Sequence, residues 1–241
     1  MNITVTPELH FKALNDMIEA SEDSQVVLNG CFGQRYIGAG LGDKEIVIHG
    51  TPGNALGAYL NGASIKVYGN GQDATGDTMN DGSIEIHGNS GDATGYAMRG
   101  GCIYVQGDAG YRAGIHMKAY QDKLPVLVIG GRAGSFLGEY QAGGIIIVLG
   151  IGCEGKAPAG HFTCTGMHGG KVYLRCSEMP AGLPSQVDIA PATAEDLADI
   201  DPYLEEFCSG FGQDKAELLK ESFYVLTPDT QNPYQQLYTY N

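Results

Sequence analysis

The stretch IEIHGNSGDATGYAMRGGCIYVQGDAG, residues 84–110, holds one unit of a repeat and the start of the next. Alternating apolar residues lead to a closing glycine, and a glycine-marked turn then leads into the next apolar run. Seven such runs occur, and their closing glycines are separated by 20, 19, 19, 19, 23 and 20 residues. A fixed period of this size indicates a repeat architecture. The closing glycines are Gly30, Gly50, Gly69, Gly88, Gly107, Gly130 and Gly150.

Two positions of each run form the predicted core. The residues four and two positions before the closing glycine are aliphatic in every run, as Ile84 and Ile86 illustrate. In a strand these positions share one face, so stacked repeats bury continuous apolar ladders. The sequence therefore predicts an all-β fold, a parallel β-solenoid of about seven or eight coils whose last strand is Val172 to Arg175. In the sixth run the same count assigns Val126 and Val128 to the core.

Glycines recur after the strands with the spacing G-x-x-G-x-x-x-G. Glycine at the same corner of every coil is expected where a tight turn requires a positive φ, because a side chain is strained there. One copy keeps two of the three glycines and has Gln72 in the middle. The predicted turn glycines are Gly50, Gly53, Gly57, Gly69, Gly76, Gly88, Gly91, Gly95, Gly107, Gly110, Gly114, Gly131, Gly134 and Gly138.

Both ends of the chain depart from the period and divide it into three parts. Residues 1–22 predict a helical cap, with Thr6 as its N-cap and Pro7 in its first turn. Such a cap covers the core and the strand edge that a terminal coil would otherwise expose. The repeat domain occupies residues 23–178, and a helical and extended tail occupies residues 179–241.

The tail begins with a proline-marked, irregular connection and then becomes helical. Thr193 and Asp196 predict a capping box at the start of a helix that ends near Phe207. A second short helix is predicted over residues 214–222. The remaining sequence, FYVLTPDTQNPYQQLYTYN from Phe223, is aromatic and extended, which suits wrapping the solenoid or docking on a partner.

The chain is strongly acidic, with a formal charge of −14 at pH 7 and an isoelectric point near 4.6. Nucleic acids and anionic membranes select for clustered Lys and Arg, so neither is expected as a partner. The amino terminus has no basic segment followed by an apolar run, and the longest apolar run, Ile145 to Leu149, is too short to span a membrane. A cytoplasmic protein with six free cysteine thiols is expected.

Two motifs resemble ligand sites but receive structural interpretations. Residues 150–155, GIGCEG, have the G-x-G-x-x-G form of a dinucleotide-binding turn. That turn needs a helix directly after it, which Pro158 and Gly160 prevent, so a further glycine corner is the better interpretation.

His49 and His87 occupy the same step of their repeats but lie about 9.6 Å apart along the predicted stack. That distance is too large for sharing a metal ion, so a solvated outer ladder is predicted.

Two further groups of residues are candidates for metal or acid–base chemistry. Asp73 and Asp92 occupy the same step of consecutive repeats, but an Asp at a turn commonly hydrogen-bonds to its own corner. Four Cys and His residues gather in the longest insertion between strands without the close spacing of zinc or iron–sulfur ligands. The sequence therefore assigns no catalytic, cofactor-binding or metal residue. The four insertion residues are Cys153, His161, Cys164 and His168.

The outer face of the strands changes character along the chain. The positions three and one before the closing glycine are polar in early repeats, such as Glu85 and His87, but aliphatic in the last two. An apolar patch of this kind is expected to be covered. The cover is the chain's own tail or a partner subunit. As to assembly, a homo-oligomer is a further alternative. The predicted contact patch consists of Leu127, Ile129, Ile147 and Leu149.

These residues resemble a known family. The G-x-x-G-x-x-x-G coils, with GYAMRGGCIYVQGDAG at residues 95–110 and GSFLGEYQAGGIIIVLG at residues 134–150, are similar to the GXGXG domain of the glutamate synthase large subunit. The same domain resembles a subunit of formylmethanofuran dehydrogenase. The likeness covers about residues 24–176 and is specific because it repeats. It implies a right-handed parallel β-helix that is noncatalytic.

The resemblance also implies a role. In glutamate synthase the glutaminase and the FMN and iron–sulfur chemistry belong to other domains. The chain is therefore expected to be a noncatalytic scaffold subunit of a split glutamate synthase-like complex, without a cofactor of its own. Its expected partners are separate amidotransferase and FMN- and iron–sulfur-binding chains.

Two alternatives stay open. One is the scaffold of a formylmethanofuran dehydrogenase-like complex, whose partner would carry a molybdenum or tungsten pterin. The other is a β-helix enzyme acting on carbohydrate. That enzyme needs a groove of clustered carboxylates or Arg across several coils, and the predicted outer ladders do not supply one.

Overall fold

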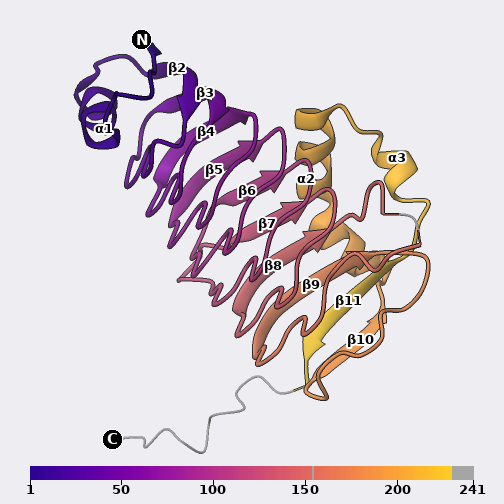
Figure 1. Ribbon diagram of the computed structural model, residues 1–241. Helices are drawn as coiled ribbons and strands as arrows, with labels where there is room; N and C mark the ends of the chain where they lie inside the picture. The colour runs from indigo at the N-terminus through magenta and orange to yellow at the C-terminus, as the bar shows by residue number, and fades with distance from the viewer. Residues whose placement is uncertain (154, 230–241) are drawn as a thin grey trace, which may run out of the picture.

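The computed structural model describes residues 1–153 and 155–229, and it is rich in strands. Figure 1 shows the strands stacked in a row, with α1 at the amino-terminal end and α2 beside the later strands. No helix of the described chain combines the length and the apolar character needed to cross a membrane. The elements are β1 (Asn2–Thr4), α1 (Phe11–Ala20), β2 (Gln25–Phe32), β3 (Glu45–Thr51), β4 (Asn61–Tyr68), β5 (Asp81–Ile86), β6 (Cys102–Val105), β7 (Val126–Ile129), β8 (Ala142–Val148), β9 (Gly169–Arg175), β10 (Val187–Pro191), α2 (Ala194–Phe211), α3 (Lys215–Leu218) and β11 (Phe223–Pro228).

The strands form one 11-stranded sheet in the order β1-β2-β3-β4-β5-β6-β7-β8-β9-β11-β10. Strands β1 to β9 pair in parallel and in chain order, as expected when consecutive repeats stack. The chain then returns after α2, because β11 pairs antiparallel with β9 and β10 pairs antiparallel with β11. Strand β10 lies where the sequence predicts an irregular connection, so the tail completes the sheet.

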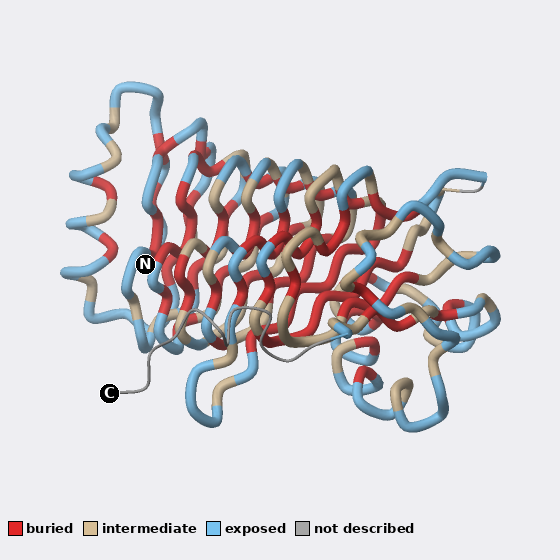
Figure 2. The backbone as a smooth tube through the Cα atoms, turned by 90° about the horizontal axis from the view of Figure 1, so that it is seen from below, coloured by how far each residue is buried: buried red, intermediate tan, exposed pale blue. Residues whose placement is uncertain are grey.

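Two apolar ladders run along the inner face of the strands. Ile84 pairs with Ile65 on one side and Ile103 on the other, and its side chain is fully buried. Figure 2 shows buried backbone, in red, along the length of the stack. One ladder consists of Val26, Ile46, Ile65, Ile84, Ile103, Leu127, Ile146 and Val172, and the other of Leu28, Ile48, Val67, Ile86, Val105, Ile129, Val148 and Leu174.

The sixth run differs from the predicted assignment by one residue. Leu127 and Ile129 belong to the inner core, whereas Val126 and Val128 belong to the cluster on the outer face. A shift of one residue moves every side chain of a strand to the opposite face. The structure therefore corrects both the predicted core pair and half of the predicted contact patch.

An insertion explains this shift. The chain adds residues after Lys118, and the closing glycine of this repeat is Gly131 instead of Gly130. The Gly131 N–H donates to the carbonyl of Gly107, just as the Gly107 N–H donates to that of Gly88, both at 2.9 Å. Core positions counted back from the closing glycine are therefore wrong in this repeat, because the insertion alters its length and two adjacent glycines end its strand.

Each of the seven turns contains three left-handed residues, and glycine usually occupies only the middle one. In one turn Ala93, Gly95 and Ala97 have φ of 56°, 72° and 50°. The flanking positions have no glycine signal, so sequence reasoning missed them. The second glycine of the motif has a different role: a Cβ on Gly53 would lie 2.2 Å from the carbonyl oxygen of Gly33. Glycine there permits two turns to approach closely.

The amino-terminal helix is shorter than predicted. Residues 2–4 form the edge strand β1, which pairs with β2, and α1 begins at Phe11. Its N-cap is His10, whose side chain accepts from the backbone N–H of Lys12, instead of Thr6. Leu14 and Ile18 are buried, so α1 contributes to the core at this end as expected of a cap.

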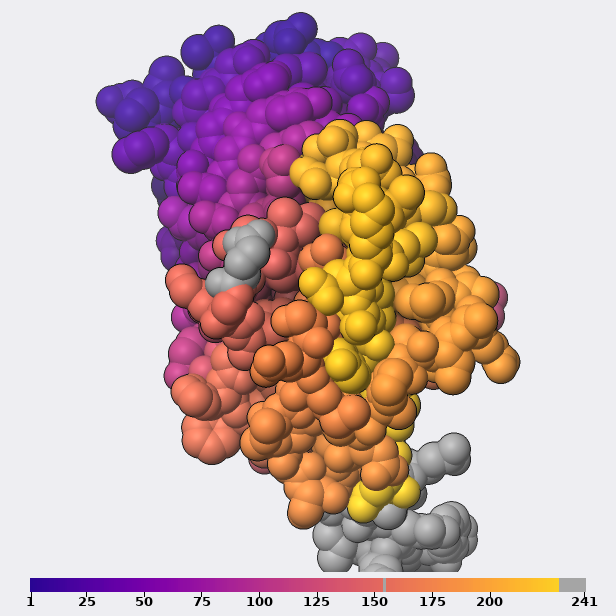
Figure 3. Space-filling view, turned by 90° about the vertical axis from the view of Figure 1, so that its right-hand side faces the viewer, coloured from indigo at the N-terminus to yellow at the C-terminus, as the bar shows by residue number. Residues whose placement is uncertain are grey.

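Helix α2 confirms the predicted capping box. The Thr193 side chain accepts from the backbone N–H of Asp196, and the Asp196 side chain accepts from that of Thr193. The helix extends past Phe207 and ends at Phe211, where Gly212 takes the left-handed conformation. Figure 3 shows this part of the chain, in yellow, lying against the side of the stack.

Candidate functional site

The outer face of strands β6 to β9 is the most apolar part of the sheet exterior, and it is covered by the carboxyl-terminal elements. Tyr173 and Ile147 are fully buried there. Alternation along each strand places these side chains opposite the inner ladders. The cluster consists of Tyr104, Val126, Val128, Ile145, Ile147, Leu149 and Tyr173 of the sheet side with Ile200, Leu204, Phe207, Cys208, Phe211, Leu218, Phe223 and Val225 of α2, α3 and β11.

The predicted contact patch is thus not an open surface. Ile147 and Leu149 lie on the outer face, but α2 and its neighbours bury them completely. Leu127 and Ile129 are also completely buried, in the inner core. Among the covers that the sequence left open, the chain's own tail covers this face.

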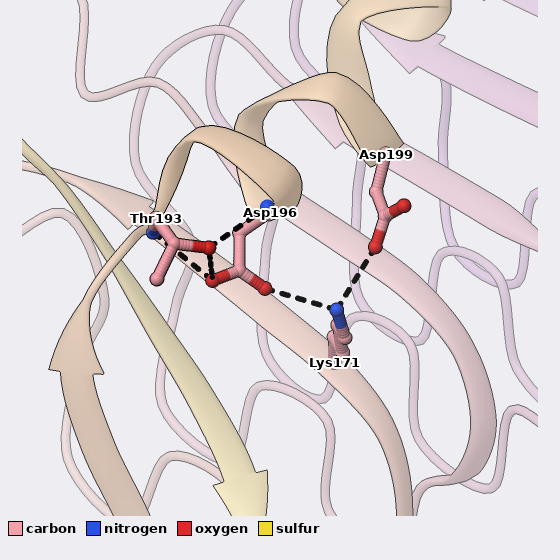
Figure 4. Close-up of polar contacts among 4 residues, drawn as sticks. All are labelled: Lys171, Thr193, Asp196 and Asp199. Atoms are coloured by element: carbon pink, nitrogen blue, oxygen red, sulfur yellow. Dashed lines mark hydrogen bonds and ion pairs between the residues drawn. The ribbon is translucent and has the colours of Figure 1, made fainter.

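Lys171 of β9 ties the start of α2 to the sheet (Figure 4). Its ammonium lies 3.0 Å from Asp196 Oδ1 and 2.9 Å from Asp199 Oδ2. Burial lowers the pKa of Lys171, but the two carboxylates raise it more, and the net shift is upward. Bonds from Thr193 and Lys171 lower the pKa of Asp196 from 3.8 to about 2. The Asp196 carboxylate therefore both caps α2 and forms an ion pair with the sheet.

The histidines of the predicted outer ladder belong to an aromatic stack. The Tyr68 ring lies between those of His49 and His87, with centroid distances of 5.1 and 4.6 Å. His87 also contacts the edge of Phe211 in α2 and pairs with Glu85. The ladder is exposed at His49 and Tyr68, whereas α2 partly covers its His87 end.

Asp73 and Asp92 do not face each other as an acid–base pair. Asp73 Oδ1 accepts from the backbone N–H of Asp92 at 2.9 Å, and Asp92 Oδ1 accepts from that of Tyr111 at 2.8 Å. Each carboxylate therefore bonds to the next repeat instead of to its own corner. A parallel row runs through Asn70, Asn89 and Asp108, each of which accepts from a backbone N–H of the following repeat.

Three of the four Cys and His residues between β8 and β9 have different surroundings. Cys164 is fully buried in the inner core, where burial raises its pKa to about 12, and it replaces the corner glycine of the seventh turn with φ 61°. His161 lines a hollow with Arg132, whereas Cys153 lines another with Gly150. Within residues 1–153 and 155–229, no three His, Cys, Asp or Glu side chains form a group able to hold a metal ion.

The glycine-rich segment that starts at Gly150 is followed by turns instead of a helix. Its hollow has a volume of about 130 Å³, well below the roughly 300–1,000 Å³ of typical ligand pockets. This place therefore offers a dinucleotide neither a helix amino terminus for its pyrophosphate nor enough volume.

The regular turns and the glycines that allow them to stack point to one family. A family model of the GXGXG motif matches residues 17–230. The chain belongs to the GXGXG motif family. In this GXGXG protein the motif glycines serve the left-handed corners, as at Gly95, and the close contacts between turns, as at Gly53.

Two relatives accompany the family match. The GXGXG chain is 46% identical to an uncharacterized protein of Methanocaldococcus jannaschii over 245 residues, which cover 96% of this chain and 94% of that protein. It is also similar to a chain in the crystal structure of the formyltransferase/hydrolase complex (FhcABCD) from Methylorubrum extorquens in complex with methylofuran. That similarity has a TM-score of 0.67 over 95% of each chain at 18% identity, so it shows a shared fold.

Proposed function

We propose that this chain is a noncatalytic scaffold subunit of a split glutamate synthase-like complex. Separate chains carry the amidotransferase activity and the FMN and iron–sulfur chemistry, and this chain holds no cofactor. In this proposal the stacked repeats form a right-handed parallel β-helix, and the complex acts in the cytoplasm. The family match over residues 17–230 supports the proposal.

The proposal rests chiefly on one observation: carboxylate oxygens of the turns form hydrogen bonds between neighbouring repeats. Asp73, Asp92 and Asp108 each accept a backbone N–H from the next repeat, at 2.9, 2.8 and 2.6 Å. Carboxylates committed to such bonds stiffen the stack instead of acting on a substrate. A stack in which each repeat contacts its neighbours gives a long, rigid surface, which suits holding partner chains.

A second candidate is the scaffold of a formylmethanofuran dehydrogenase-like complex. The observation that favours it is the structural similarity to a chain of the formyltransferase/hydrolase complex. That chain is part of a multi-subunit assembly, which supports protein partners in general. At 18% identity it does not select this candidate over the first.

Purification of the tagged chain from its native source tests the proposal. Copurifying chains are identified by mass spectrometry, and their cofactors by flavin fluorescence, iron analysis and pterin analysis. An amidotransferase together with an FMN-containing chain is the expected result. A chain with a molybdenum or tungsten pterin supports the second candidate, and recovery of neither kind of partner contradicts the scaffold role.

A further inference from the structure

One edge of the stack carries a row of rings that is exposed to solvent. His116 stacks on Tyr140, with ring centroids 5.2 Å apart and planes 12° apart, and it contacts the edge of Tyr96 at 5.9 Å. Tyr96 and Tyr140 keep 39% and 38% of their surface exposed. The three rings come from three consecutive turns, so they form a continuous row across the repeats.

A second row shares two of these turns and extends one turn further along the stack, to Phe162. Phe136 stacks on Phe162 with centroids 5.0 Å apart, and Tyr111 contacts Phe136 at 5.7 Å. Arg112 lies over the Phe136 ring and pairs with Glu139, between Phe136 and Tyr140 in sequence. Phe136 and Tyr140 flank one turn, within which the Glu139 N–H donates to the Phe136 carbonyl, so both rows follow the same line of turns. We call the six rings Tyr96, Tyr111, His116, Phe136, Tyr140 and Phe162 the aromatic edge.

The fold of the turns does not require these rings. Phe136 and Phe162 have φ of 63° and 60°, a conformation that is unfavourable for a bulky residue. The corresponding residue of the earlier turn 93–97 is Ala93, with φ 56°. The left-handed conformation at this step belongs to every turn, so the fold accounts for the backbone but not for a bulky ring there. At the other end of the stack, the ring in the same position, Tyr36, contacts Phe11 of α1 at 5.8 Å, so this position already receives another element.

Cations without acidic partners lie beside the aromatic edge. The side chains of Arg99 and Lys118 make no ion pair or hydrogen bond within the described part of the chain, although the sequence has 28 acidic and 14 basic residues. Both line a hollow of about 340 Å³ together with His116 and Tyr120. A second hollow, of about 370 Å³, shares Arg99 and Tyr120 and adds Lys123.

The insertion after Lys118 forms the wall of these hollows. Tyr120 and Lys123 exchange backbone hydrogen bonds of 3.1 and 3.0 Å, and the Lys123 ammonium lies 2.8 Å from Asp81 Oδ2. The loop is thus attached to the strand that begins at Asp81. Insertions in repeat proteins commonly mark the binding face, and this one lies beside the aromatic edge.

We propose that the aromatic edge and the adjoining hollows are a docking surface for an acidic segment of a partner protein. Carboxylates of that segment bind Arg99 and Lys118, and its apolar side chains lie on the two rows of rings. The proposal rests on the scaffold function for the existence of a partner. Aromatic residues and Arg are enriched at protein interfaces, and complementary charge directs the encounter. RNA, the other polymer that such a surface suits, needs a continuous positively charged groove along its backbone, whereas Arg99 and Lys118 form one small group of cations.

A peptide-binding experiment tests the surface without any native partner. The probe is a fluorescein-labelled peptide of ten Glu and two Tyr residues, and its binding to the full chain is measured by fluorescence anisotropy at low salt. We expect Arg99→Glu with Lys118→Glu to weaken binding at least tenfold, and Phe136→Ala with Phe162→Ala to weaken it severalfold. The control, Lys12→Glu with Lys220→Glu, makes the same charge change on α1 and beyond α3 and should bind like the wild type. Circular dichroism establishes that each variant is folded.

The same variants are then tagged and purified from the native source. Loss of the copurifying chains from Arg99→Glu with Lys118→Glu, but not from the control, supports the docking surface. Three results overturn it: no binding of the Glu/Tyr peptide to the wild-type chain, equal binding by the charge-reversed and control variants, or binding of poly(U) in preference to the peptide. A wild-type chain that binds the peptide but recovers no partner contradicts the scaffold function alone.

Discussion

The imidazole of His87, directly after β5, contacts the ring of Phe211, the last residue of α2, edge to face with centroids 4.9 Å apart. The first turn of the same helix is held by the ion pair of its Asp196 with Lys171 of β9. One helix is therefore attached near both of its ends and crosses the outer face of the sheet from β9 towards β5. This placement makes α2 a structural part of the stack.

Shortening a buried side chain of α2 should destabilise the whole protein. Leu204 is fully buried in the outer cluster, and Leu204→Ala should lower the free energy of unfolding by about 3 kcal/mol through lost burial and the cavity left behind. Leu197→Ala, on the partly buried side of the same helix, should cost less than half as much. Urea unfolding followed by circular dichroism measures both. Equal, small effects would show that α2 is not part of the cooperative unit.

Acid should remove the contribution of Asp196. Its pKa is lowered from 3.8 to about 2 in the folded protein, so the unfolded chain binds the proton more readily. The stabilisation is present above pH 3.8 and is lost as the pH falls towards 2. Asp196→Asn should therefore destabilise the protein more at pH 5 than at pH 2.5, as measured by urea unfolding. A difference between wild type and variant that does not change with pH would contradict the assignment.

The hydrogen bonds between turns should depend on the side-chain oxygen and not on its charge. Asp92→Ala removes the acceptor for the Tyr111 N–H and should cost about 1 kcal/mol. Asp92→Asn keeps an acceptor oxygen and should be nearly neutral, because Asn70 and Asn89 perform the same task in the adjacent row. Thermal and urea unfolding compare the two variants. A large effect of the Asn variant would indicate a role for the negative charge.

Substituting two glycines of the motif should distinguish the cost of a strained backbone from the cost of a crowded Cβ. A Cβ on Gly95 meets its nearest neighbour, Leu127 Cδ2, at an ordinary 3.6 Å, so Gly95→Ala should cost about 1 kcal/mol from its positive φ alone. A Cβ on Gly50, whose φ is also positive, would lie 2.4 Å from the backbone carbonyl oxygen of Cys31, so Gly50→Ala should cost more, about 2–3 kcal/mol. Ala93→Gly, in the same turn as Gly95, relieves a positive φ and should not destabilise. Unfolding free energies that are equal for all three variants would refute this account.

The repeat made much of the fold predictable. Ile84 and Ile103 recur at the same step of their runs, and this period alone places them in one buried ladder. The prediction failed at Val126, because an insertion and two adjacent glycines, Gly130 and Gly131, hide the true end of the repeat. A count along the chain cannot detect such a shift, whereas pairing with β6 fixes it.

The roles of the polar residues were less predictable. Asp92 has the sequence signature of a turn residue, and the turn role fits, but its partner is the N–H of Tyr111 in the next repeat. The half-buried ring of Phe136 and the exposed ring of Phe162 give no periodic signal, because the corresponding residue of an earlier turn is Ala93. Their alignment into one row depends on how the turns stack.

The sequence by itself determined the stacked repeats, the inner ladders and the capped helix after Thr193, because period, alternation and capping act between residues close in the chain. Only the tertiary structure decided that α2 covers the outer face and that β11 pairs with β9. These contacts join segments that are far apart in the chain, and no period or motif in the sequence identifies one as the partner of the other. The apolar character of Leu149 predicted that something covers it. Its cover, α2, was fixed by the packing of Leu204 and Phe207 and by the ion pairs of Lys171.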